Sequence, residues 1–248
     1  KAPSGASRPL DESRLAELIA GAAAGLAGVE AQAIFAETKR NLYDGMSEDE
    51  LALAQIMAAR TLIETEPNYA YASARLLLNK LRAEALSFLN GHPDVADQAQ
   101  MAERYAAYFA DYVEYGIAAG LLDPELRRFD LTRLGRALKP EADLNFQYLG
   151  LQTLYDRYFL HDGGVRFELP QAFFMRVAMG MAIREVDREA RAIEFYGVLS
   201  AFDVMSSTPT LFNAGTLRPQ LSSCFLTTVS DDLDGIFKSV KDNALLAK

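Results

Sequence analysis

The chain has 248 residues, of which 50% are hydrophobic and 24% charged, as in a folded globular protein of one or two domains. A formal net charge of −9 argues against non-specific nucleic-acid binding, although a small nucleotide site remains possible. The first residues lack the apolar stretch of a signal peptide, and no apolar run approaches the roughly 20 residues that span a bilayer. With a single cysteine and hence no disulfide framework, we expect a cytoplasmic protein.

Helical periodicity dominates the first 205 residues, after a short polar leader from Lys1 to Pro9. Ser47 and Glu50 have the spacing of a capping box at the start of one helix. Pro170 marks the start of another helix, because a proline in the first turn loses no needed hydrogen bond. The expected helical segments cover residues 11–26, 29–41, 47–66, 69–89, 95–120, 131–137, 144–160, 170–181 and 189–205.

The sequence pattern changes near residue 206. Residues 206–220 are dense in Ser, Thr, Pro, Asn and Gly and predict a loop. Leu221 to Val229 is apolar and β-branched between turn residues, which predicts a strand, and Asp234 to Lys248 predicts a final helix. Because the chain begins without Met and this helix carries no stop signal, we expect a piece of a longer protein.

Considered alone, the chemically interesting residues have ordinary structural explanations. Cys224, on the predicted strand, would usually be a small buried hydrophobic residue. Two adjacent acids, Asp231 and Asp232, are typical of a helix N-cap. His92 and His161 lack a paired metal-binding spacing, so we expect no metal site. An aromatic stripe at helical spacing predicts packing: Tyr105, Tyr108, Phe109, Tyr112 and Tyr115.

Several motifs, in order along the chain, resemble the large (alpha) subunit of class I ribonucleotide reductases. They are NLYDGMSEDEL (41–51), YAYASARLLLNKLR (69–82), YLGLQTLYDRYFL (148–160), RFELPQAFFMRVAMG (166–180) and SSTPTLFNAGTLRPQLSSCFLTTVSDDLDGI (206–236). The resemblance implies a mainly α chain that leads into the first strand of a ten-stranded α/β barrel. The implied domains are a degenerate or truncated ATP-cone-like region (1–90), a helical domain (91–205) and the start of the catalytic barrel (206–248).

Residue roles follow from the same resemblance. Cys224 is expected to be one of two redox-active thiols that reduce a ribonucleoside diphosphate by radical chemistry, with the partner cysteine outside this chain. Thr208 and Ser223 are expected to bind the substrate, and hydroxyl groups suit that task. The effector deoxynucleotide is expected at Asp231, Asp232 and Leu233. Because the thiyl cysteine would also lie elsewhere, this chain alone should be inactive.

The resemblance also implies cofactors and partners. We expect no cofactor in this chain, a radical-generating metal-containing small (beta) subunit, thioredoxin or glutaredoxin as reductant, and a homodimer of large subunits. The implied effectors are ATP, dATP, dTTP and dGTP. Residues 1–9 lack the basic strand motif of an ATP-cone, so residues 1–89 are not expected to bind ATP. Two alternatives remain: a cobalamin-dependent class II enzyme, or a non-catalytic helical interaction module in which Cys224 is packing.

Overall fold

A computed structural model describes residues 9–248, so most of the expected leader lies outside the described residues. The described part is mainly helical, as the sequence predicts, and its one sheet is the hairpin of β1 (His161–Asp162) and β2 (Val165–Arg166). The helices are α1 (Glu12–Ala23), α2 (Ala31–Arg40), α3 (Glu48–Thr61), α4 (Tyr69–Asn90), α5 (Gln98–Ala118), η1 (Pro124–Arg128), α6 (Leu131–Arg136), η2 (Pro140–Asn145), α7 (Tyr148–Arg157), α8 (Pro170–Ala182), α9 (Arg188–Ser200), α10 (Thr208–Asn213) and α11 (Leu233–Ala247).

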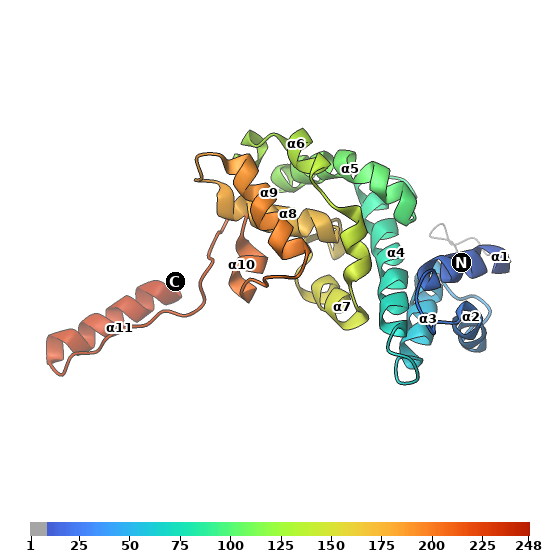
Figure 1. Ribbon diagram of the computed structural model, residues 1–248. Coiled ribbons are helices and arrows are strands. Elements are labelled where there is room, and N and C mark those ends of the chain that lie inside the picture. The colour runs from blue at the N-terminus through green and yellow to red at the C-terminus, as the bar shows by residue number, and fades with distance from the viewer. Residues whose placement is uncertain (1–8) are drawn as a thin grey trace.

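Helix α2 packs on α1 and α3, and α1 and α3 pack against α4 (Figure 1). Side chains cap the starts of α1 and α3: Asp11 Oδ1 accepts the N–H of Arg14 at 3.0 Å at the start of α1. The predicted capping box is confirmed in α3. There, the Glu50 N–H donates to Ser47 Oγ at 3.2 Å, and the Ser47 N–H donates to Glu50 Oε2 at 2.7 Å.

Helix α4 joins this N-terminal group to the rest of the chain. It packs on α1 and α3 and also on α5 and α7 (Figure 1). It ends at Gly91, whose φ of 69° is left-handed and therefore suits glycine at the end of a helix. The break expected between the helical segments 69–89 and 95–120 is confirmed, whereas the division into domains at residue 90 stays a prediction.

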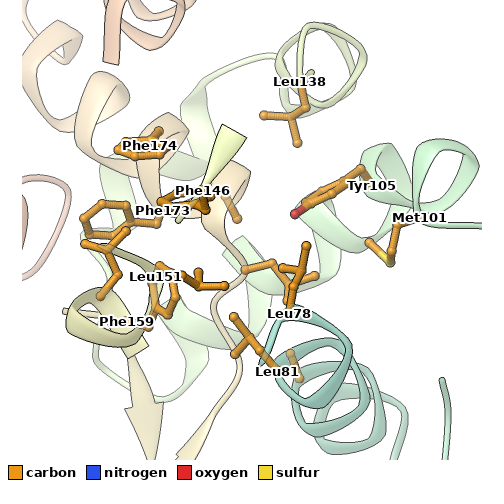
Figure 2. Close-up of a cluster of buried hydrophobic side chains, with 14 of the residues drawn as sticks. Leu78, Leu81, Met101, Tyr105, Leu138, Phe146, Leu151, Phe159, Phe173 and Phe174 are labelled. Carbon is orange, nitrogen blue, oxygen red and sulfur yellow. The ribbon is translucent and has the colours of Figure 1, made fainter. Parts of the chain in front are cut away.

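The main core lies among α4, α5, α7 and α8 (Figure 2). Helix α8 is central, because every residue from Pro170 to Met179 is buried. The aromatic stripe of α5 packs as predicted, and Tyr105, Tyr108 and Tyr112 lie buried with Phe109. The labelled core residues in Figure 2 are Leu78, Leu81, Met101, Tyr105, Leu138, Phe146, Leu151, Phe159, Phe173 and Phe174.

A buried polar network crosses this core. Arg82 Nη2 lies 2.9 Å from Asp143 Oδ2, and both side chains are at most 1% exposed. Tyr105 donates its hydroxyl to Asp143 at 2.7 Å, and Gln171 donates an amide N–H to it at 2.7 Å. The carboxylate therefore has partners on α4, α5 and α8, as a buried charge requires.

The region after residue 200 departs from the sequence predictions. Residues 208–213 form the short helix α10, where a loop was expected. The predicted strand Leu221–Val229 is wrong: these residues have no regular secondary structure, because no described segment pairs with them in a ladder. Helix α9 ends at Ser200 rather than Met205, and Phe202 follows with a φ of 63°. Helix α11 forms as predicted and lies apart from the helical body (Figure 1).

Candidate functional site

A buried ion pair holds α10 against α8. Arg176 and Glu168 side chains are both 0% exposed, and Arg176 Nε lies 2.7 Å from Glu168 Oε1. The same guanidinium donates to two carbonyl oxygens of the α10 region, at 2.7 Å to Ala214 and 3.2 Å to Leu211. These oxygens lie near the C-terminal end of the helix, where carbonyls lack intrahelical partners. Arg176 supplies the missing donors.

Glu168 has its own supports in the core. It accepts the Tyr112 hydroxyl at 2.5 Å and the Leu160 N–H at 2.9 Å. Burial, reinforced by the negative charge of Glu168, raises the pKa of Tyr112 well above its usual value of 10.0. The phenol therefore stays protonated and keeps donating to the carboxylate.

The turn after α10 lies directly on α8 because Gly180 has no side chain. A Cβ at Gly180 would lie 2.1 Å from the nitrogen of Gly215 and 2.6 Å from the carbonyl carbon of Ala214. Gly215 itself has a φ of 76°, a left-handed conformation that favours glycine. Its carbonyl oxygen accepts the Asp123 N–H at 3.0 Å. Two glycines thus set the path of the chain that leads to Cys224.

Thr208 is exposed at the first residue of α10. Its Oγ1 lies 3.1 Å from the hydroxyl oxygen of Tyr158, at the end of α7. The Tyr158 ring stacks on Phe212, also of α10, with ring centroids 4.5 Å apart and planes 18° apart. One tyrosine therefore contacts α10 through both its ring and its hydroxyl.

Cys224 and Ser223 lie in the exposed segment that follows. The start of this segment is tied to α10, because Asn213 Nδ2 donates to the Gln220 carbonyl at 2.7 Å and Thr210 Oγ1 to the Leu221 carbonyl at 3.3 Å. The Cys224 thiol is free and exposed, with its sulfur 3.8 Å from Ser223 Oγ. The buried packing that a lone cysteine would usually favour is absent at this residue.

Asp231, Asp232 and Leu233 lie at the start of α11, and all three are exposed. Asp232 is the N-cap and accepts the Gly235 N–H at 2.8 Å. This backbone hydrogen bond, with help from the Ser230 hydroxyl, lowers the pKa of Asp232 below its usual value. Ser239 Oγ donates back to the Thr228 carbonyl at 3.1 Å, so α11 is tied to the segment that precedes it.

The structure brings some of these residues together and leaves others apart. Thr208 is joined to Tyr158, and Ser223 is next to Cys224, but no hydrogen bond among residues 9–248 links either pair to Asp231–Leu233. Tyr158 and Arg176 were not predicted as site residues. Arg176 carried a usable signal, since it is a charge within the apolar helix PQAFFMRVAMG, whereas nothing in the sequence indicated Tyr158.

Chemically, the region offers a free thiol and several exposed hydroxyls, which suit a polar ligand that undergoes thiol chemistry. Within residues 9–248, no group of three or more His, Cys, Asp or Glu could hold a metal ion. In the same range, none of the helices is both long and apolar enough to cross a membrane.

Comparisons with known proteins agree on one family. Residues 144–219 match the family model for the all-alpha domain of ribonucleotide reductase. A ribonucleoside-diphosphate reductase subunit alpha of Chlamydia muridarum is 48% identical over 209 residues, which cover 84% of this chain and 19% of the relative. The Helicobacter pylori subunit alpha is 35% identical over 242 residues, 97% of this chain and 29% of the relative. The large subunit of Danio rerio is 33% identical over 210 residues, 84% of this chain and 25% of the relative. The chain thus spans less than a third of the length of these relatives.

Proposed function

Since this chain belongs to the family of ribonucleotide reductase large subunits, we propose that it forms part of a class I ribonucleoside-diphosphate reductase. The complete protein would convert ribonucleoside diphosphates to deoxyribonucleoside diphosphates for DNA synthesis in the cytoplasm. In this proposal, its partners are a radical-generating small subunit, a second large subunit, and thioredoxin or glutaredoxin.

The proposed chemistry uses Cys224 as one of two reducing thiols. A thiyl radical elsewhere in the protein starts the reaction, the C2′–O bond of the ribose breaks, and the oxygen leaves as water. Two thiols supply the two electrons and become a disulfide, which the external dithiol reduces again. This chain has one cysteine, so the second thiol must come from elsewhere in the protein.

Thr208 and Ser223 are proposed to hydrogen-bond the substrate, and the exposure of both residues supports this role. Asp231, Asp232 and Leu233 are proposed to bind the effector deoxynucleotide. The Asp232 carboxylate is already engaged as the helix cap, which leaves Asp231 as the better acceptor for a sugar hydroxyl. The proposed effectors are ATP, dATP, dTTP and dGTP.

One observation carries the redox proposal: the only thiol of the chain is exposed and free, next to the Ser223 hydroxyl and shortly after the matched domain. In the full-length protein with its small subunit and thioredoxin, Cys224→Ser is expected to abolish multiple-turnover formation of deoxyribonucleoside diphosphate. Val186→Ser, which changes a fully exposed residue outside these elements, should leave the rate unchanged.

Other outcomes would support the alternatives. Full activity of the Cys224→Ser protein would favour a packing role for the cysteine. Activity that requires adenosylcobalamin and no small subunit would identify the class II enzyme instead. Each result is distinct from the loss that the redox role predicts.

A further inference from the structure

Tyr158 is the residue in closest polar contact with Thr208. It follows the last residue of α7, and its backbone N–H donates to the Leu154 carbonyl at 2.9 Å, which fixes the end of that helix. Its hydroxyl oxygen lies 3.1 Å from Thr208 Oγ1. Thr208 is exposed, while Tyr158 is partly buried. A partly buried side chain thus supports an exposed hydroxyl.

Helix α10 is held at both of its ends, although it has only six residues. At its C-terminal end, Arg176 donates to the carbonyls of Leu211 and Ala214. Tyr158 contacts Thr208, the first residue of the helix, through its hydroxyl and stacks its ring on Phe212, one turn further along. These contacts place the Thr208 hydroxyl before any ligand arrives, and such preorganisation lowers the entropy cost of binding.

The direction of the Tyr158–Thr208 hydrogen bond decides what Thr208 can offer a ligand. A threonine hydroxyl has one proton and two acceptor lone pairs. When Tyr158 donates, it occupies one lone pair of Thr208 Oγ1 and leaves the threonine proton free to donate outward. A diphosphate oxygen only accepts hydrogen bonds, so it needs that proton. An anionic ligand therefore selects the arrangement in which Tyr158 donates.

We propose that Tyr158 is a positioning residue for substrate binding, which orients the Thr208 hydroxyl as a donor to the diphosphate of a ribonucleoside diphosphate. The proposal rests on the substrate role proposed above for Thr208. Tyr158 acts through Thr208 and does not itself take part in the thiol chemistry.

The test separates the hydroxyl of Tyr158 from its ring. In the full-length protein, Tyr158→Phe keeps the ring on Phe212 and removes only the hydroxyl. We expect KM for the ribonucleoside diphosphate to rise about 3- to 10-fold with little change in kcat and in the melting temperature, since one charge-assisted interaction is weakened. Tyr71→Phe is the matched control. It removes another partly buried tyrosine's hydroxyl, which accepts from Gln147 at 3.2 Å, and it should change neither constant.

A double-mutant cycle shows whether Tyr158 acts through Thr208. Thr208→Val should raise KM by about tenfold, Thr208→Ser should retain most of the affinity, and Tyr158→Phe should have no further effect in the Thr208→Val protein. The proposal on Tyr158 would be overturned if Tyr158→Phe raised KM as much in the Thr208→Val protein as in the wild type, or if it left KM of the wild type unchanged. Neither result would affect the substrate role of Thr208. If Thr208→Val left KM unchanged, the substrate role of Thr208 and the inference on Tyr158 would both be wrong.

Discussion

Replacement of Arg176 by methionine should destabilise the chain strongly. The change keeps a long side chain but leaves the Glu168 carboxylate buried without its cation, and it removes the donor to the Leu211 and Ala214 carbonyls. Breaking a fully buried ion pair costs about 3 to 5 kcal/mol. Because total stabilities are about 5 to 15 kcal/mol, the loss should be a large fraction of the free energy of unfolding.

Urea unfolding followed by circular dichroism measures this loss as a lower transition midpoint. The matched control is Arg191→Met, which breaks an ion pair with Glu194 whose side chains are 52% and 58% exposed. Exposed pairs contribute at most about 1 kcal/mol, so this variant should be nearly as stable as the wild type. Adding Glu168→Gln to Arg176→Met should recover part of the loss, because the buried charge is then gone. Equal stability of Arg176→Met and Arg191→Met would refute the role given to the buried pair.

Three further predictions concern other parts of the chain. Gly180→Ala should lower the urea midpoint, because the new Cβ would lie 2.1 Å from the Gly215 nitrogen. Gly197→Ala in α9 is the control: nothing lies within 4 Å of its new Cβ, so it should raise stability by about 0.5 to 1 kcal/mol. A Gly180→Ala protein more stable than the Gly197→Ala protein would contradict this. Hydrogen bonds from the Ser47 N–H, the Tyr43 hydroxyl and the Ser47 hydroxyl lower the pKa of Glu50 from 4.5 to about 2. The contribution of Glu50 to stability should therefore be complete above pH 4.5 and lost as the pH falls to about 2. If the melting temperature of a Glu50→Gln protein followed the same pH profile as that of the wild type over this range, the prediction would be disproved. Calorimetric titration of the chain with ATP should show no tight binding by residues 1–89, and stoichiometric binding that is lost when residues 1–89 are removed would contradict this.

Local sequence signals predicted most of the helical body. Ser47 and Glu50 are three residues apart, so their capping box depends on neighbouring residues alone and forms as expected. Pro170 likewise starts α8 at the predicted residue. The aromatic stripe of α5 was assigned to packing because its spacing matches one helical face, and its tyrosines are indeed buried or partly buried.

Long-range contacts explain the two failures after residue 200. Helix α10 is too short to be stable from its own hydrogen bonds, and Arg176, more than 30 residues away along the chain, supplies the partners for its carbonyls. The segment Leu221–Val229 has strand-forming residues, but a strand also needs a paired neighbour, which residues 9–248 do not provide.

The candidate site was only partly accessible from the sequence. Cys224, Thr208 and Ser223 stood out through their motif, and the structure adds that all three are exposed. Tyr158 could not be found in this way, because 50 residues separate it from Thr208 and the fold alone brings them together. Arg176 could have been suspected from its charge within an apolar helix, but its partner Glu168 and its carbonyl contacts depend on the tertiary structure.

Direct observation of Cys224 during turnover tests the redox role most closely. The reduced full-length protein, with its small subunit and a ribonucleoside diphosphate but no external dithiol, would be quenched with an alkylating reagent and analysed by mass spectrometry. We expect Cys224 to lose alkylation in proportion to the deoxyribonucleoside diphosphate formed, to appear in a disulfide, and to regain alkylation after reduction. Complete alkylation of Cys224 after product has formed would contradict its role as a reducing thiol.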